Sequence, residues 1–474
     1  MKDLMIALQS GKTSLYEQIY LSIKRDIEDG KISFGEKLPS TRLLAANLNV
    51  SRFTVDLAYS QLVSEGYIQS RAGSGFFVCD LSNLYSGISG AKTSAEGEAT
   101  GKAQKEAPPC SVRIDFSPFA VDSAQFPYNT WKKRNREVFD EITDILVARE
   151  AAGDHSLRET IANYLYHARG VHCTPEQILV GAGNEYLLLL LVQILGGGRS
   201  VVMENPTYLQ AYHVLCRAGC QVRVGEMDED GLCCGSLDRG PVDVVYVMPS
   251  HQFPVGAVMP FSRRQELLDW AKAAEGRYII EDDHDSEFRY VGKPIPSLQS
   301  GDQDDRVIYF GTFSKSISPA LRMSYMVLPR HLSERFYEQF DFYSSTVPTQ
   351  QQLAVCRFMQ SGDFERHLNR MRRVYKAKHD FLLKELKQRP WVKKVRGENA
   401  GLHLVVEVSC ACTEEELLEA ALQKGVRVYG MNSYRIGPVE QTEPVTLLLG
   451  FGGLSEKELS EGLAVLDGLL DAGS

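Results

Sequence analysis

Residues 311–329 read GTFSKSISPALRMSYMVLP and begin where the apolar run of residues 307–310 ends. In this stretch Lys315 follows two small hydroxyl residues, Thr312 and Ser314, and Arg322 stands seven positions after the lysine. A lysine amine forms a Schiff base with an aldehyde, and hydroxyl and guanidinium groups hold a phosphate dianion. A lone Ser-Lys pair would more often be a surface loop. With its neighbours, the stretch predicts a site for a phosphorylated aldehyde.

Three segments upstream supply the other parts of such a site. YIIEDDHDSEF (278–288) is an apolar strand ending in carboxylates, which places Asp282 to pair with a protonated pyridine nitrogen. GAGN (181–184) opens an apolar helical run, so the backbone N–H groups of Gly183 and Asn184 can hold phosphate. In ENPTY (204–208), Tyr208 can stack on the pyridine face. The order of these parts favours one cofactor site.

The long second part of the chain, residues 111–474, alternates apolar runs with amphipathic helical patterns. Strands are expected at residues 178–180, 201–203, 242–247, 278–280, 307–310 and 323–327, each followed by a polar or glycine-rich turn. This alternation is typical of an α/β fold with a mainly parallel central sheet, whose ligands bind at such turns.

The first 80 residues predict a small helical reader with a hairpin. A first helix is expected from Leu15, Ile19, Ile23 and Ile27, which recur at spacing four before Gly30. Two more helices follow in LPSTRLLAANLNV (38–50) and SRFTVDLAYSQLVSEGY (51–67), separated by a tight turn. This spacing predicts a helix-turn-helix, and QSRAGSGFFV (69–78) adds a two-stranded wing.

Within the reader, individual positions have distinct expected roles. Ser40 and Ser51 are expected to cap the second and third helices, with Asn49 in the turn between them. The first turn of the third helix would project its side chains toward base edges, while other positions pack inward. The projecting residues are Arg52, Phe53 and Thr54, and the inward ones are Val55, Ala58, Leu62 and Val63.

Composition sets the boundaries between these parts. Residues 81–110 are rich in Gly, Ser, Ala and charge with few large apolar side chains, which predicts a flexible linker between a domain at 1–80 and one at 111–474. The net charge is −9, yet residues 1–80 hold nine basic and nine acidic residues, so the deficit lies beyond them. Nucleic acid, if bound, is therefore expected at the N-terminal end.

Cysteine spacing and hydropathy exclude other classes of protein. The ten cysteines lack the pattern of a disulfide framework and are expected to be free thiols, and the absence of a C-x2-C pair predicts no structural metal. No apolar run approaches the ~18 residues that a membrane helix needs, and the first residues do not read as a secretory signal. We expect a cytoplasmic protein without a membrane partner.

Two family resemblances follow from these motifs. Nearly all of residues 14–78, including the Arg-Ala-Gly-Ser-Gly wing, resembles the GntR-type winged helix, and the cofactor motifs resemble fold-type I aminotransferases from about residue 115 to 470. The combination, with GDHSLRETIANYLYHARGVHC (153–173), MPSHQFPVG (248–256) and EDDHDSEFRY (281–290), resembles the MocR family of regulators. The resemblance implies a winged helix-turn-helix fused to an α/β domain that binds pyridoxal 5′-phosphate (PLP).

The resemblance also implies roles for particular residues. Lys315 would carry PLP, Asp282 would face its ring nitrogen and Tyr208 would stack on the ring. The phosphate cup would consist of Gly183, Asn184, Thr312, Ser314 and Arg322. DNA contacts would come from Arg42, Arg52, Thr54 and Gly75, with Ser40 and Ser51 holding helix starts or touching phosphate. Few basic residues line this surface, so one reader alone would bind DNA weakly. The resemblance therefore implies a homodimer whose two readers bind two half-sites.

Two departures from the aminotransferase pattern concern the cofactor and its substrate. The Asn of the usual Asn-Pro-x-Gly turn is absent from the segment that includes Phe253, so the phenolic oxygen of PLP would meet either His284 or Gln252. The arginine that usually binds a substrate carboxylate is replaced by Leu448 in LLLGF (447–451). Arg435 is an alternative candidate for binding the carboxylate. A loop arginine exposed to solvent is an equally good interpretation of this residue.

These expectations favour a regulator over an enzyme. The leading hypothesis is a DNA-binding protein whose PLP domain senses PLP or an amino compound in a head-to-tail homodimer, with vitamin B6 or amino-acid metabolism as the regulated process. The rival is a working aminotransferase with an accessory DNA-binding head. We expect no sustained turnover of a substrate, and an aminotransferase-type half-reaction remains an alternative. A third reading, a DNA-binding protein whose large domain only dimerises, predicts no bound cofactor.

Overall fold

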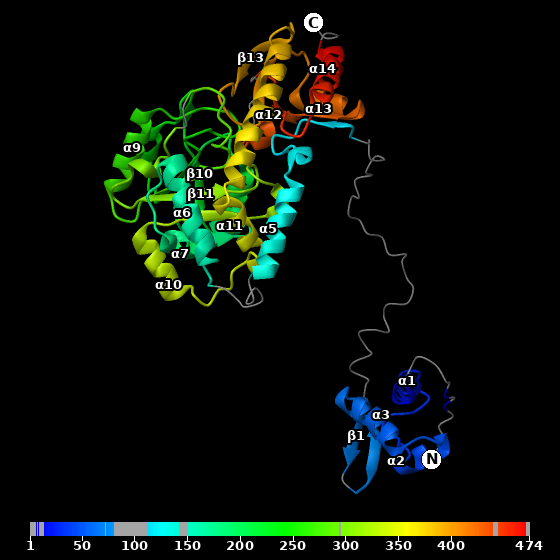
Figure 1. Ribbon diagram of the computed structural model, residues 1–474. Helices are drawn as coiled ribbons and strands as arrows, with labels where there is room; N and C mark the ends of the chain where they lie inside the picture. The colour runs from blue at the N-terminus through cyan, green and yellow to red at the C-terminus, as the bar shows by residue number, and fades with distance from the viewer. Residues whose placement is uncertain are drawn as a thin grey trace. The chain divides into compact units, whose positions relative to one another are not determined.

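The computed structural model describes residue 6, residue 8 and residues 14–71, 73–79, 112–141, 150–292, 295–438 and 444–470. The chain divides into two compact units, Met1–Lys105 and Glu106–Ser474 (Figure 1). The predicted linker, residues 81–110, lies outside the described residues. None of the helices in the described ranges is long and apolar enough to cross a membrane.

The N-terminal unit has the three helices and the hairpin that its sequence predicts. Helix α1 spans Leu15–Glu28, α2 spans Thr41–Leu48 and α3 spans Arg52–Ser64. The side chains of Ser40 and Ser51 cap α2 and α3 by accepting hydrogen bonds from Leu43 N and Thr54 N. Strands β1 (Ile68–Arg71) and β2 (Gly75–Val78) form the antiparallel wing.

The core of this unit differs from the predicted one in two positions. Ile19, Ile23 and Ile27 are buried as expected, whereas Leu15 at the first turn of α1 is 44% exposed. Val63 is also exposed, and Tyr59 takes the inward position, where its hydroxyl donates to the carbonyl of Pro39. The hydrogen bond satisfies both polar groups inside the core, which lets an aromatic ring replace an aliphatic side chain.

The C-terminal unit is built on a seven-stranded sheet in the order β4-β12-β11-β10-β9-β5-β6. Only β12 runs antiparallel to its neighbours, so the expected mainly parallel sheet is confirmed. All six predicted strands are present, and β6 is an addition. The strands are β4 (Ile178–Gly181), β5 (Ser200–Met203), β6 (Gln221–Val224), β9 (Val244–Val247), β10 (Tyr278–Asp283), β11 (Val307–Thr312) and β12 (Ser324–Val327).

Helices cover both faces of this sheet, because alternate side chains of its central strands enter different cores. In β9, for example, Val244 packs in one buried cluster and Val245 in another. Helices α7 (Asn184–Leu195), α8 (Leu209–Arg217) and α10 (Arg330–Gln339) share the cluster of Val244. The opposite face is covered by α6 (His155–Arg169), α9 (Phe261–Lys272) and α11 (Thr349–Gln360), and α11 in turn contacts α5 (Tyr128–Glu141).

A second, smaller sheet follows the long helix α12 (Asp363–Leu386). Its order is β13-β14-β17-β16, from Val392–Arg396, His403–Val408, Thr446–Gly450 and Tyr429–Gly430. Helices α13 (Glu414–Gln423) and α14 (Glu456–Leu470) pack against it. The short strands β3 (Ile114–Asp115) and β15 (Val426–Arg427) pair with each other, and β7 (Met227–Asp228) pairs with β8 (Gly231–Leu232).

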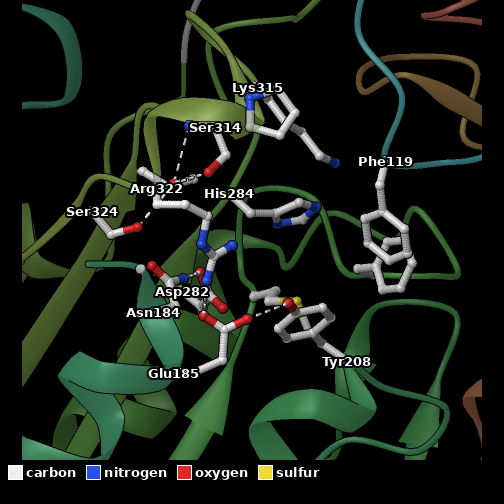
Figure 2. A pocket seen from close by; sticks show the side chains of 15 residues that line it. Phe119, Asn184, Glu185, Tyr208, Asp282, His284, Ser314, Lys315, Arg322 and Ser324 are labelled. Atoms are coloured by element: carbon white, nitrogen blue, oxygen red, sulfur yellow. Dashed lines mark hydrogen bonds and ion pairs between the residues drawn. The ribbon is translucent and has the colours of Figure 1, made fainter. Parts of the chain in front are cut away.

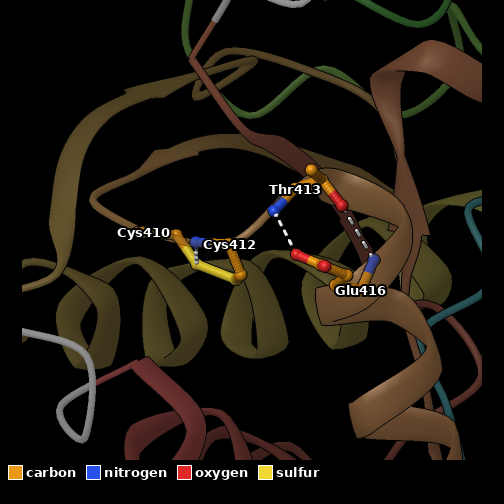
Figure 3. The surroundings of a disulfide bond; sticks show 4 residues. All are labelled: Cys410, Cys412, Thr413 and Glu416. Atoms are coloured by element: carbon orange, nitrogen blue, oxygen red, sulfur yellow. Dashed lines mark hydrogen bonds between the residues drawn. A yellow bond between two sulfur atoms is a disulfide. The ribbon is translucent and has the colours of Figure 1, made fainter.

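Two cysteines contradict the expectation of free thiols. Cys410 and Cys412 form a disulfide directly before Thr413, the N-cap of α13 (Figure 3). Their Cα atoms lie 5.3 Å apart, within the range that a disulfide spans, because the chain turns tightly into the helix. The other seven described cysteines are free. The prediction was wrong here because spacing does not reveal the local turn.

Two glycines of α14 offer a matched test of packing in the C-terminal unit. A Cβ on Gly462 would lie 2.5 Å from the ring of buried Phe116, whereas a Cβ on Gly468 would meet nothing within 4 Å. We expect Gly462→Ala to lower the free energy of unfolding by about 1–3 kcal/mol through overpacking. Gly468→Ala should raise it by about 0.5–1 kcal/mol, because alanine favours the helix. Denaturant unfolding measures both, and equal effects would contradict the packing.

Candidate functional site

A cavity of about 260 Å³ opens at the end of the large sheet. It contains nine of the ten residues that the sequence predicts for a cofactor. Figure 2 shows Ser314, Ser324 and Arg322 on one side of the pocket, with Tyr208 and Phe119 opposite. Its lining is Phe119, Gly183, Asn184, Glu185, Tyr208, Met248, Phe253, Asp282, His284, Thr312, Ser314, Lys315, Pro319, Arg322 and Ser324.

Strand order brings these distant segments together. Strands β10 and β11 are parallel neighbours, and Asp282 pairs in register with Phe310, just before Thr312. Strand β4 lies beside β12, so the turn that starts α7 at Asn184 reaches the same edge. Carboxyl ends of neighbouring parallel strands meet at one edge, which is why their turns form a single pocket.

Lys315 enters the pocket as a buried amine without a hydrogen bond. Its side chain is 8% exposed, and Nζ has no hydrogen-bond partner among the described residues. The nearest carboxylate oxygen, Oδ2 of Asp285, lies 3.5 Å from Nζ. Because an unsatisfied buried amine is costly, a lysine in this setting is poised to react with a ligand rather than to stabilise the fold.

Asp282 is a buried carboxylate with two polar neighbours. The hydroxyl of Tyr246 donates to one of its oxygens, and Nδ2 of Asn184 lies 3.3 Å from the other. Burial raises the pKa of Asp282 to about 6, although the hydrogen bond from Tyr246 opposes the rise. A buried carboxyl group of this kind suits a partner that shares a proton with it, such as a pyridine nitrogen.

Hydroxyl groups and a guanidinium gather on the phosphate side of the pocket. Oγ1 of Thr312 lies 3.0 Å from the hydroxyls of both Ser314 and Ser324. Arg322 forms an ion pair with Glu185, at 2.8 Å from NH2 to Oε2. The N-terminus of the 12-residue helix α7 opens beside them. Donors, a cation and a helix N-terminus together make an anion site.

Gly183 leaves room for an anion at this helix start. Its φ is +102°, and a Cβ there would lie 2.6 Å from NH2 of Arg322. Any other residue would be strained and would displace the guanidinium. The glycine in GAGN is therefore explained by both the backbone conformation and the approach of Arg322.

Aromatic residues form the wall opposite the phosphate side. The ring of Phe119 lies 6.2 Å from that of Tyr208 and 5.2 Å from that of Phe253, centroid to centroid. Six lining residues are not predicted from the sequence, and neither is Tyr246 as a partner of Asp282; the six are Phe119, Glu185, Met248, Phe253, Pro319 and Ser324. Glu185 directly follows GAGN, and four others lie inside the segments 248–256 and 311–329, whereas Phe119 comes from a segment with no motif of its own.

The two residues predicted to meet the phenolic oxygen differ in their position relative to the pocket. Gln252 does not line the pocket, because Nε2 donates to the carbonyl of Pro206 and Oε1 accepts from Val255 N. His284 does line it, and its Nε2 has no hydrogen-bond partner within the described ranges. Burial lowers the pKa of His284 to about 3, so its ring is neutral and can donate or accept.

The carboxylate arginine of aminotransferases has no replacement inside the pocket. Leu448 is fully buried on β17 in the same apolar cluster as Phe253 and Tyr434. Arg435 does not line the cavity, although Thr207 N donates to the carbonyl of the preceding Tyr434. Arg435 thus follows a segment that is bonded to the loop before Tyr208, and its role as an effector ligand stays a prediction.

The reader unit presents the residues expected to contact DNA. Arg42 and Arg52 are exposed on α2 and α3, and the side chain of Arg52 is only loosely paired with Asp56, at 3.4 Å. Ser51 and Thr54 share a 2.7 Å hydrogen bond at the start of α3. Phe53 is 72% exposed beside them, and Gly75 has a φ of +105° at the wing turn. This surface stays a predicted DNA interface.

Comparison with known proteins agrees with the two units. Residues 15–78 match the family of bacterial regulatory proteins of the gntR type, and residues 118–466 match aminotransferase class I and II. A kynurenine aminotransferase from Pyrococcus horikoshii, solved with PMP, is 25% identical and superposes with a TM-score of 0.66. That comparison covers 76% of this chain and 91% of the enzyme. The aminotransferase family confirms PLP as the expected cofactor.

Relatives that match nearly the full chain are transcription regulators. The regulator YdeL of Bacillus subtilis is 39% identical over 95% of this chain and 96% of its own length. The probable rhizopine catabolism regulatory protein MocR of Rhizobium meliloti is 31% identical, over 95% of this chain and 92% of that protein. The pyridoxine biosynthesis regulator PdxR of Corynebacterium glutamicum is 30% identical over 99% of both chains. The chain therefore belongs to the MocR-type regulators, in which a GntR-type DNA-binding region is joined to an aminotransferase-like PLP domain.

Proposed function

We propose that this chain is a ligand-responsive transcription regulator that binds operator DNA as a homodimer in the cytoplasm. Its C-terminal unit senses PLP itself or an amino compound that reacts with bound PLP. Binding there changes how the two readers are presented to two DNA half-sites. The observation that carries the proposal is a PLP-type pocket without the arginine that would anchor an amino-acid substrate, since Leu448 stands in its place.

The residues of the pocket fit PLP group by group. Lys315 presents a buried amine without a hydrogen bond to an aldehyde, and Asp282 would hold a proton at the ring nitrogen. The hydroxyls of Thr312, Ser314 and Ser324, with Arg322, surround an anion site. When bound, PLP supplies an aldehyde and an electron sink. Lys315 attaches it, His284 contacts its phenolic oxygen, and Tyr208 with Phe119 covers the ring.

PLP is the favoured effector because the pocket anchors the cofactor better than a substrate. The name of PdxR, a pyridoxine biosynthesis regulator of similar length, supports a link to vitamin B6. A head-to-tail dimer would bring the reader of one subunit to the large unit of its partner, which couples the two sites. An amino-acid effector and the aminotransferase alternative both need a cation for the carboxylate. Arg435 would supply it, because its segment is bonded to the loop before Tyr208.

The proposal predicts a coupling between cofactor and DNA that depends on Lys315. The purified chain with PLP should show an absorption band at about 420 nm, which Lys315→Ala should lack. DNA selected from a random pool should bind with an affinity that changes on adding PLP or an amine, in the wild type only. Arg52→Ala is the control for the reader: it should keep the band and lose DNA affinity.

Three outcomes would contradict the regulator in different ways. Steady transamination of several amino acids without any selected DNA would favour the aminotransferase. An absorption band combined with a DNA affinity that neither PLP nor an amine changes would mean that the chain binds the cofactor without using it for regulation. Absence of the band after adding PLP would leave a DNA-binding protein whose large unit only dimerises.

Asp282 has a matched control on its own strand. We expect Asp282→Asn to weaken PLP binding by about 1.5–3 kcal/mol, roughly ten- to a hundredfold, because the ring nitrogen loses a charged hydrogen-bond partner. Asp283→Asn should leave PLP affinity unchanged and lower stability, since Asp283 is bound by Arg169 and Tyr309 instead. Fluorescence titration with PLP measures the affinity, and equal losses in both variants would argue against the assigned role.

A further inference from the structure

Four acidic residues follow one another closely in EDDHD, residues 281–285, and three have a partner that explains them. Glu281 accepts hydrogen bonds from the backbone N–H groups of Leu298 and Gln299. Asp283 is bound by Arg169 and Tyr309, which ties β10 to its neighbours. Asp282 faces the pocket with Tyr246 behind it. The fourth acid, Asp285, is not explained by a contact of any of these kinds.

Asp285 is a buried anion whose neighbours are titratable side chains. It is 1% exposed, and both of its oxygens lie 3.0–3.1 Å from Nδ1 of His251. Oδ2 is also 3.4 Å from Nε2 of His284 and 3.5 Å from Nζ of Lys315. Burial alone would raise the pKa of Asp285, but its interactions with His251, and also with Lys315, hold it well below its usual range. The group is therefore a carboxylate.

His251 holds this carboxylate in a fixed position. A Cβ on Gly401 would lie 2.2 Å from Cε1 of His251, so the glycine at this position admits the ring closely. With Nδ1 directed at the carboxylate, the ring carries its proton there as a donor. Because His251 fixes its orientation, the carboxylate of Asp285 is preorganised to interact with a cation. The side-chain nitrogen of Lys315 lies 3.5 Å from its Oδ2.

We propose that Asp285, oriented by His251, is the counter-ion of Lys315 and keeps the nitrogen of that lysine protonated. It is a positioning residue for the cofactor-bearing amine. The effect applies to the free amine and, on the proposed function, to the same nitrogen when it is joined to the cofactor aldehyde. A protonated nitrogen at that junction favours exchange with an incoming amine, so Asp285 would set the pH range in which an amine effector is sensed.

Other titratable groups around Lys315 do not replace Asp285. Burial lowers the pKa of both His284 and His403 to about 3, so neither ring carries a charge near neutral pH. His367, on the far side of Lys315 in a second cavity, has its pKa lowered to about 4 by burial. Three other acids line the two cavities that Lys315 reaches. Asp282 is assigned to the ring nitrogen, Glu185 is paired with Arg322 at 2.8 Å, and Asp122 is paired with Lys378 at 2.7 Å.

The first test is the pH titration of the absorption spectrum of the full-length chain with PLP. Removing a negative charge beside a cation lowers the pKa of that cation, so Asp285→Asn should move the midpoint down by about 1–3 pH units. Asp285→Glu keeps the negative charge, so its midpoint should stay near that of the wild type. Asp283→Asn is the matched control, because it also removes a buried carboxylate from the segment but should leave the midpoint in place.

The second test does not need the cofactor. Reductive methylation of the PLP-free chain with formaldehyde, followed by mass spectrometry, reports how fast Lys315 reacts at each pH. Asp285→Asn should make Lys315 react at lower pH than in the wild type, whereas Asp283→Asn should not. An unchanged pH profile for Asp285→Asn in this test would overturn the proposal, whether or not PLP binds. A missing absorption band would count against the proposed function alone.

Discussion

Ionisable groups are buried at one edge of the large parallel sheet, and the site depends on how their charges are balanced. Removing a charge from water is costly unless a partner compensates it. Lys315 is buried without a hydrogen bond, and Asp282, Asp283 and Asp285 lie within a few residues of one another on β10 and the loop after it. Arg169 balances Asp283, whereas Asp282 lines the pocket and Asp285 lies 3.5 Å from Nζ of Lys315. This arrangement favours a ligand that is both an aldehyde and a proton acceptor.

The sheet makes this arrangement possible because its strands are parallel and buried on both faces. Alternate residues of β9 and β10 enter the apolar clusters on the two sides, so few positions remain for polar side chains. Polar groups are therefore confined to the strand ends, where α7 and the loop after β11 also begin. A site at this edge follows from the architecture, and its specificity follows from the residues of the turns.

The departures from the aminotransferase pattern make sense together. Leu448 stands where the aminotransferase sequence pattern has an arginine, and it is buried in an apolar cluster with Phe253 and Tyr434. Gln252 uses both ends of its amide to bind backbone groups, so it supports the loop rather than the cofactor. The pocket thus combines the residues expected to hold PLP with an aromatic wall. The proposed role in recognition agrees with the regulators that match nearly the whole chain.

The sequence by itself determined the two units, the six main strands, the helix-turn-helix and most of the residues that line the candidate pocket. These features are carried by local signals: N-caps at Ser40 and Ser51, apolar periodicity, and motifs such as GAGN and the Lys315 stretch. Only the tertiary structure decided which segments without a motif reach the pocket. Phe119 enters from the chain after β3, and Asp285 lies beside His251 from the loop after β9. Contacts between residues far apart in sequence depend on strand order, whereas spacing along the chain records only local geometry.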